Sequence, residues 1–245
     1  DNTTNTITDS SRLSTEEDYS AAIYSKEDLI INGNGTLNVN AGYRNGIKST
    51  DDCIIVSGTL NITSTEDGII GKDLCGIVAG DININAGSDG IKSTYDTDTT
   101  KGNVIIEGGN ITIKASNDGI QAENILVIND GTINIKTNNG AADTTQTHID
   151  NMDMGRGGFG FNNNKTTTTT DDTSESRKGI KAGNMLIIND GDITIDSDDD
   201  SVHCNSVIYI YGGTINAATG DDGVHADDLL TVNGGTINIT QCYEG

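Results

Sequence analysis

The feature that most constrains this chain is an internal repeat of about 22 residues that returns along most of its length. Each copy reads Asp-Gly-Ile-x-Ala/Ser, then an apolar stretch, then x-Gly, and then Thr/Asn-Ile-Asn/Thr-Ile. The first glycine of the pattern recurs, with Ser201 in its place in one copy, at Gly46, Gly68, Gly90, Gly119, Gly179, Gly223 and Gly245. A unit this short cannot bury its own apolar residues, so successive copies must stack on one another.

Three short strands and three corners in each copy predict an all-β fold, a right-handed parallel β-helix (solenoid) with one coil per repeat and a spacing of roughly 4.8 Å between coils. Strings such as Ile82-Asn83-Ile84 place apolar residues on one face of a strand. Equivalent isoleucines then form ladders along the axis, which suits a chain with only 4% aromatic residues. The second glycine of each copy, from Gly58 to Gly235, is expected to turn the backbone with a positive φ.

The repeat also sets the expected domain organisation. Residues 1–20 are polar and acidic and are predicted to form an N-terminal cap segment, and residues 21–245 a single β-helix domain. Insertions interrupt the repeat at about 95–101 and 140–176. Because the sequence stops at Glu244-Gly245, where a further coil would open, we expect an uncapped C-terminal end and a truncated chain.

The charge of the chain excludes some partners. With 37 acidic and 14 basic side chains, the formal net charge is −23. Nucleic acid binding needs a basic surface, so nucleic acid is not an expected partner. No apolar run approaches the roughly 20 residues of a membrane-spanning helix, so membrane insertion is not expected either.

The four cysteines show no metal-type spacing. Cys53 and Cys75 occupy the same inward position in adjacent coils, within disulfide range of each other. A disulfide and a pair of buried thiols both remain open, with the thiols preferred. Cys204 and Cys242 are expected to be inert.

Acidic residues recur just before the first glycine of the repeat, so carboxylates should stack over carboxylates at one corner. Such neighbours repel by about 3 kcal/mol at an effective dielectric of 20, which favours a neutralising cation. A corner rich in carboxylate and carbonyl oxygens is what calcium prefers. The alternative is that each aspartate only caps local backbone N–H groups in an Asp-Gly turn. The candidate calcium ligands are Glu66, Asp67, Asp89, Asp118, Asp198, Asp199, Asp200, Asp221, Asp222 and Glu244.

An outward-facing column follows the ladder isoleucine of each copy, between two raised corners that would form a groove. This mixture of Lys, His and Gln beside bound cations would suit an acidic or hydroxyl-rich polymer lying along the axis. Alternatively, the lysines only pair with neighbouring aspartates, and the two histidines are either stacked surface residues or transition-metal ligands. The candidate carbohydrate-binding residues are Lys48, Lys92, Gln121, Lys181, His203 and His225.

Three copies, Ser88-Asp-Gly-Ile-Lys-Ser93, Asn117-Asp-Gly-Ile-Gln-Ala122 and Asp221-Asp-Gly-Val-His-Ala226, resemble those of a clostridial family of secreted carbohydrate-binding β-helix proteins with a pectate-lyase-like fold. The closing Cys242-Tyr-Glu-Gly245 is similar too. The resemblance implies calcium held between coils by acidic corners, and binding of cellulose or acidic plant polysaccharide.

Three functions follow from these patterns. The preferred one is a non-catalytic, calcium-dependent polysaccharide-binding protein that is secreted or held at the cell surface. The second is a calcium-dependent pectate-type lyase with Lys92 or Lys181 as the base, which the aspartates around these lysines disfavour. The third is a structural adhesin or filament subunit that associates end to end.

Overall fold

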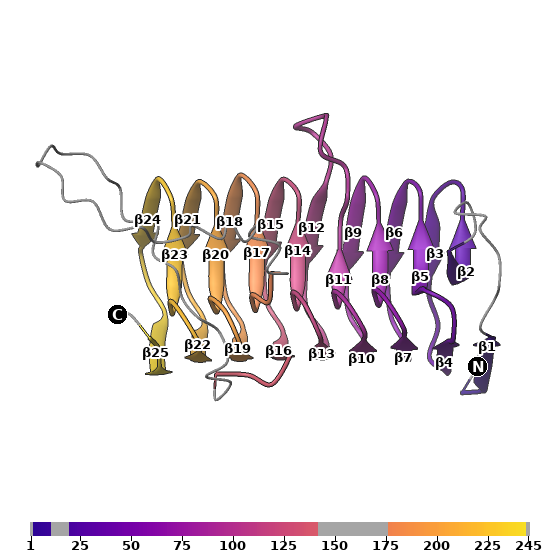
Figure 1. Ribbon diagram of the computed structural model, residues 1–245. Helices are drawn as coiled ribbons and strands as arrows, with labels where there is room; N and C mark the ends of the chain where they lie inside the picture. Colours follow the sequence, from indigo (N-terminus) through magenta and orange to yellow (C-terminus); the bar gives the residue numbers. More distant parts are fainter. Residues whose placement is uncertain (1, 11–19, 142–175, 244–245) are drawn as a thin grey trace, which may run out of the picture.

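The structure, a computed structural model, describes residues 2–10, 20–141 and 176–243, and it is a parallel β-helix (Figure 1). Each coil adds one strand to each of three sheets that run along the stack, and the paired strands are parallel. The described residues contain no helix, and hence none with the length and apolar character needed to cross a membrane. The predicted fold class is confirmed.

We name the three sheets A, B and C after the order in which a coil reaches them. Sheet A consists of β1 (Thr4–Asp9), β4 (Thr36–Ala41), β7 (Thr59–Ser64), β10 (Asp81–Ala86), β13 (Asn110–Ala115), β16 (Thr132–Thr137), β19 (Asp192–Ser197), β22 (Thr214–Thr219) and β25 (Thr236–Gln241). Sheet B consists of β2 (Ala21–Ser25), β5 (Asn45–Ser49), β8 (Ile69–Gly71), β11 (Ile91–Lys92), β14 (Ile120–Ala122), β17 (Ile180–Ala182), β20 (Val202–Cys204) and β23 (Val224–Ala226). Sheet C consists of β3 (Leu29–Ile31), β6 (Asp52–Ile55), β9 (Leu74–Ile77), β12 (Asn103–Ile106), β15 (Ile125–Ile128), β18 (Met185–Ile188), β21 (Val207–Ile210) and β24 (Leu229–Val232).

The core is built from the predicted aliphatic ladders. On sheet B, Ile91 lies between Ile69 and Ile120, and all three are fully buried. On sheet A, a second ladder includes Ile82 and Ile111, in register and equally buried. Because each buried isoleucine contributes about 1.5–3 kcal/mol, repetition of one side chain per strand stabilises the stack without large aromatic rings.

The two glycine columns serve different purposes. The second column turns the chain into sheet A, and its φ angles run from 82° at Gly213 to 126° at Gly131, as predicted. The first column allows adjacent coils to approach closely. A Cβ at Gly90 would lie 2.5 Å from the carbonyl oxygen of Gly119 and would also collide with Ile113.

Cys53 and Cys75 lie opposite each other on β6 and β9 as free, buried thiols. Burial raises the pKa of the Cys53 thiol to about 12, which keeps it protonated and unreactive. The segment expected to cap the first coil supplies β1, which pairs with β4. Most of the 140–176 insertion, and the candidate ligand Glu244, lie outside the described residues.

Candidate functional site

The predicted acidic residues do stack, in a line along the turns that lead into sheet B. We call this line the aspartate column. The carboxylates of Asp67, Asp89, Asp118 and Asp200 each accept a hydrogen bond from the backbone N–H of the equivalent residue one coil further on. Asp67 Oδ1 accepts from the N–H of Asp89 at 3.0 Å, and Asp89 Oδ1 from that of Asp118 at the same distance. The equivalent residues, in coil order, are Asn45, Asp67, Asp89, Asp118, Lys178, Asp200 and Asp222.

Basic side chains of the protein itself neutralise much of this column. Lys92 Nζ lies 2.5 Å from Asp89 Oδ2, and Lys181 Nζ lies 3.4 Å from Asp118 Oδ2. Further along, Lys178 Nζ is 3.0 Å from Asp200 Oδ2. The structure therefore contains both alternative features, namely backbone capping, which was the alternative to a bound cation, and lysine pairing, which was the alternative to polymer binding by the outer column.

The charge balance differs between the two ends of the column. Burial, followed by the neighbouring Asp89 carboxylate, raises the pKa of Asp67. Burial also raises the pKa of Asp118, by more than Lys181 lowers it. At Asp200, burial is outweighed by hydrogen bonds from His203 and Lys178, which hold the pKa of that carboxyl well below its usual range. Negative charge is thus poorly compensated near Asp67 and well compensated near Asp200.

Near the C-terminal end, three of the predicted ligands come together. Oxygen atoms of Asp199, Asp200 and Asp221 lie within 4.8 Å of one another. Lys178 Nζ contacts two members of this group, because it also lies 2.8 Å from Asp199 Oδ2. A cation at this group would therefore share it with an ammonium.

The remaining predicted ligands have other partners. Asp198 is paired with Arg177 Nη1 at 2.8 Å, and Asp222 Oδ2 accepts a hydrogen bond from His225 Nδ1 at 2.9 Å. Glu66 Oε1 lies 3.6 Å from Arg44 Nε. These residues lie on or beside the column without forming one common oxygen cage.

The predicted carbohydrate-binding residues form a single column on the outer face of sheet B. Register pairs join them coil by coil, interrupted by Ile70. Every member has a polar partner: Lys48 Nζ donates to Ser20 Oγ at 3.2 Å, and Gln121 Nε2 donates to Glu123 Oε1 at 3.0 Å. Lys92 and Lys181 pair with the aspartate column, as do His203 and His225.

A second acidic group lies at the turn between sheets B and C, on the other side of this outer column. Carboxylate oxygens of Asp28, Asp51 and Asp52 lie within 4.8 Å of one another. A hydrogen bond between carboxyl groups of Asp51 and Asp73 raises the pKa of Asp51, and burial, followed by repulsion from Asp28, raises that of Asp52. This group was not predicted from the sequence, although Asp51 and Asp73 are 22 residues apart and so carry the signal of the repeat.

The insertion near 95–101 forms the projecting connection between β11 and β12 (Figure 1). The ring of Tyr95 contacts two ammonium groups, with Lys72 Nζ 4.8 Å and Lys101 Nζ 5.0 Å from the ring centroid. Lys101 is also paired with Asp73. Cation–π contacts and one ion pair therefore attach the projecting loop to Asp73, which is hydrogen-bonded to Asp51 of the second acidic group.

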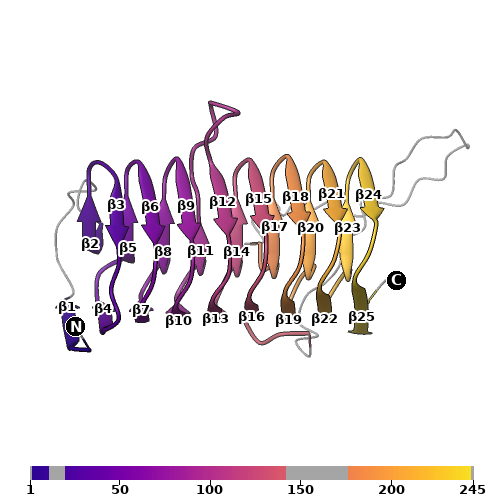
Figure 2. The ribbon, with the colours of Figure 1, turned by 180° about the vertical axis from the view of Figure 1, so that it is seen from behind.

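The outer face of sheet C, whose strands can be followed in Figure 2, carries several exposed apolar side chains. Ile30 is 62% exposed, and Val78 in the turn after β9 is 43% exposed. Tyr209 and Tyr211 stack with their ring centroids 6.3 Å apart. Sheets B and C therefore present faces of opposite chemical character.

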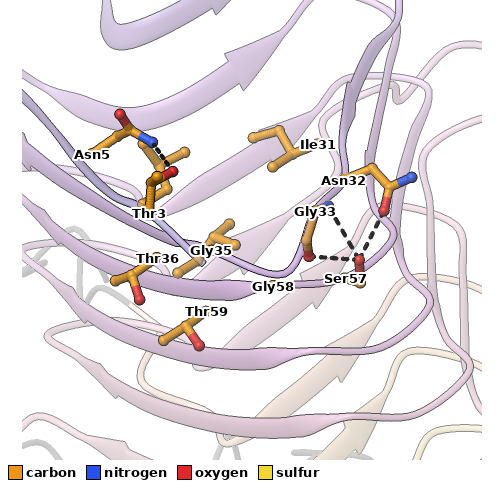
Figure 3. Close-up of a pocket in the computed structure, with 12 residues that line it drawn as sticks. Thr3, Asn5, Ile31, Asn32, Gly33, Gly35, Thr36, Ser57, Gly58 and Thr59 are labelled. Carbon is orange, nitrogen blue, oxygen red and sulfur yellow. Dashed lines mark hydrogen bonds between the residues drawn. The ribbon is translucent and has the colours of Figure 1, made fainter. Parts of the chain in front are cut away.

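Two hollows lie away from the outer column of sheet B. One, of about 300 Å³, opens beside the first coils, where Ser57 Oγ donates to Asn32 Oδ1 or the Gly33 carbonyl and accepts the Gly33 N–H (Figure 3). The other, of about 320 Å³, lies at the turns of the second glycine column near Gly131 and Gly191. Neither contains members of the aspartate column.

Comparison with known proteins gives three findings. A family model described as carbohydrate-binding domain-containing protein matches residues 1–223. A carbohydrate-binding domain-containing protein from Acetivibrio thermocellus is 45% identical over 42 residues, which cover 17% of this chain and 15% of that protein. The solved gadolinium derivative of the polysaccharide lyase-like protein from C. thermocellum has a TM-score of 0.52 and 34% identity, over 55% of this chain and 56% of that one. The chain thus spans about half of that solved structure and a smaller share of the curated relative.

Proposed function

The chain belongs to the family of carbohydrate-binding domain-containing proteins, and on that premise we propose that it is a non-catalytic, calcium-dependent polysaccharide-binding protein, secreted or held at the cell surface. The observation that carries the proposal is the outer column of sheet B. It runs along the whole coil stack and is bordered by carboxylates at the turns on both sides. A linear polymer lying along the axis would contact one coil after another.

Calcium has a physical role in this proposal. A protein with a net charge of −23 repels a polyuronate, so an acidic polymer needs a cation between its carboxylates and those of the protein. The groups Asp28/Asp51/Asp52 and Asp199/Asp200/Asp221 offer clustered oxygens of the kind calcium takes. The raised pKa values of Asp51 and Asp52 favour the first group, because a cation there would relieve the repulsion that these two carboxylates experience from Asp28 and Asp73.

The solved relative supports a hard cation in this fold only indirectly. It is described as a gadolinium derivative, and gadolinium, like calcium, is a hard cation that prefers oxygen ligands. The proposed polymer is cellulose or an acidic plant polysaccharide, and calcium bridging makes the acidic polymer the better match for sheet B. A neutral chain would instead suit the apolar outer face of sheet C.

A lyase is the second candidate, because the solved relative is described as polysaccharide lyase-like. The chemistry of Lys92 opposes it. Burial lowers the pKa of this lysine, but Asp89, Asp67 and Asp118 together raise it above its ordinary value. A general base must lose its proton near neutral pH, which these carboxylates oppose. End-to-end association into filaments remains a prediction that sizing of the intact chain would test.

Co-sedimentation tests the proposed function. The protein is incubated with insoluble cellulose and with insoluble pectin, in calcium and in chelator, and the supernatant is followed by near-ultraviolet absorbance. We expect calcium-dependent depletion of the protein from solution with no unsaturated product. Accumulation of unsaturated uronate would establish the lyase instead, and no depletion with either polymer would overturn the proposal.

A further inference from the structure

One four-residue motif occurs twice, in adjacent coils near the C-terminal end. Asp200-Ser-Val-His203 and Asp222-Gly-Val-His225 each place a carboxylate at the turn and a histidine on the outer face of sheet B. Because β20 and β23 pair in register, His203 lies directly opposite His225. Their ring centroids are 5.0 Å apart. The repeat therefore gathers two imidazoles and two carboxylates on one patch of surface.

The donor atoms of this patch face one another. His203 Nδ1 lies 2.7 Å from Asp200 Oδ2, and His225 Nδ1 lies 2.9 Å from Asp222 Oδ2. Ligand atoms of Asp200, His203 and His225 also lie within 4.8 Å of one another across the two coils. Ligands around a tetrahedral zinc ion, with bonds of about 2.0–2.2 Å, are roughly 3.3 Å apart, so small side-chain rotations would close the set.

We propose that Asp200, His203, Asp222 and His225 form a binding site for a divalent transition-metal ion of the zinc class. Imidazole nitrogen is a preferred ligand of such ions, whereas calcium takes oxygen. Two nitrogens and two carboxylate oxygens complete a tetrahedral set without another molecule. None of the equivalent residues in the other coils is a preferred ligand of such ions, so the site is confined to these two coils. Those residues are Tyr24, Lys48, Ile70, Lys92, Gln121 and Lys181.

The surroundings hold the four ligands in orientation. Asn205 Oδ1 is 2.9 Å from His203 Nε2, and Asp227 Oδ1 is 3.1 Å from His225 Nε2, so each ring is fixed at its far edge as well. An oxygen acceptor on the second nitrogen is the usual support of a metal-bound histidine. Lys178, which also contacts Asp200, can keep Asp199 as its partner when a metal occupies the site.

The inference goes beyond the proposed function and does not depend on it. A metal at this position would crosslink two successive coils and would stabilise their stacking. Asp200 also belongs to the acidic group considered for calcium, so the experiment must separate the two ions. Zinc binding at this site and polysaccharide binding on sheet B are independent, so either can be observed without the other.

Isothermal titration calorimetry tests the site: zinc chloride is titrated into the chelator-treated full chain in the presence of excess calcium. We expect a zinc-binding event in wild type that His203→Gln and His225→Gln each weaken by at least about tenfold. Cobalt(II) substitution should give the intense visible bands of tetrahedral coordination. Asp227→Asn, at the far edge of the ring, should weaken zinc binding less than Asp222→Asn does.

Metal-free thermal melts of each variant show that the fold is kept, and His225→Gln, in the more exposed coil, carries the test if His203→Gln unfolds. Zinc should raise the melting temperature of wild type and leave that of His225→Gln nearly unchanged. Equal zinc affinity of wild type and both histidine variants, or displacement of zinc by calcium, would overturn the proposal. A larger loss in Asp227→Asn than in Asp222→Asn would overturn the ligand assignment.

Discussion

The turn Asp89–Lys92 and the turn Asp200–His203 occupy the same place in two coils of the β-helix, yet they differ in both packing and charge. The first has glycine at its second position and a lysine facing outward. The second has Ser201 and His203 at those positions, and Lys178 contacts its aspartate as well. The comparison shows which parts of the repeat are fixed by the stacking of coils and which are free to change the chemistry of the surface.

The packing difference is compensated inside the core. Gly90 lies against Ile113, and a side chain at this position would collide with it. At the corresponding place the coil of Ser201 has Ala217, which is aligned with Ile195 on the adjacent strand of sheet A. The smaller alanine leaves room for Ser201, whose hydroxyl contacts Ser197 Oγ at 3.0 Å. The hydrogen bond from Val202 N to Gly223 O is 3.3 Å long, against 3.0 Å for that from Ile91 N to Gly119 O.

The largest expected effect is on this packing. Gly90→Ser should destabilise the protein by about 3 kcal/mol, because the new side chain meets Ile113 and the Gly119 carbonyl with no room to move. Chemical denaturation measures the loss. In the double variant Gly90→Ser/Ile113→Ala, the two effects should couple by at least about 1 kcal/mol. Strict additivity would contradict the compensation inferred for Ser201 and Ala217.

Calcium binding is expected to have the next largest effect, and it compares the two acidic groups. At 100-fold excess over the dissociation constant, one site adds about 2.7 kcal/mol to the free energy of unfolding. Thermal melts with calcium and with chelator should therefore differ, and Asp28→Asn, in the first group, should reduce the difference more than Asp221→Asn, in the second. If chelator leaves the wild-type melt unmoved, calcium at either group is wrong.

Charge compensation in the aspartate column comes third. Asp200→Asn should cost about 2 kcal/mol at pH 7, since it removes the carboxylate that balances Lys178 and His203 in a largely buried setting. Asp67→Asn should change stability by less than about 0.5 kcal/mol. Asn45 shows that an asparagine can accept the equivalent backbone hydrogen bond one coil earlier, and the raised pKa of Asp67 shows that its charge is not stabilised. Denaturation of both variants in one buffer gives the comparison, and equal costs would refute it.

The smallest effect is a pH dependence confined to the histidine coils. Burial lowers the pKa of His225, but the hydrogen bond to Asp222 and the charges of the nearby carboxylates together raise it by more. The net pKa therefore lies above its ordinary value. Its contribution to stability is therefore complete below the unfolded pKa of about 6.5 and is lost as the pH rises through the folded value. In chelator, His225→Gln should flatten the melting temperature between pH 5.5 and 8, and Lys92→Gln should not. An unchanged profile in His225→Gln would contradict the assignment.

Much of the fold follows from the sequence because the repeat fixes register. Once Ile69, Ile91 and Ile120 are assigned to one ladder, the three sheets, the facing inward positions of Cys53 and Cys75, and the positive φ at Gly131 all follow. The alignment of aspartates follows in the same way. Periodicity could predict these features since each depends on the position of the backbone alone.

The partners of the aspartates could not be predicted in the same way. Whether Lys178 reaches Asp199 and Asp200, or Lys92 reaches Asp89, depends on side-chain conformations that the spacing does not determine. The group of Asp28, Asp51 and Asp52 could not be predicted because its members do not share one position of the repeat: Asp28 is equivalent to Asp52, whereas Asp51 stands one position earlier. Their turn lies on the opposite side of sheet B, where the copies differ in length.

The central claim is that the outer column of sheet B binds an acidic polysaccharide through calcium. Calorimetry with soluble polygalacturonate in calcium tests it most directly, on wild type, Lys92→Gln and the matched surface variant Lys114→Gln on sheet A. The account predicts binding that chelator abolishes, that Lys92→Gln weakens by about tenfold (about 1.4 kcal/mol), and that Lys114→Gln leaves unchanged. Binding that persists in chelator, or that both lysine variants weaken equally, would contradict it.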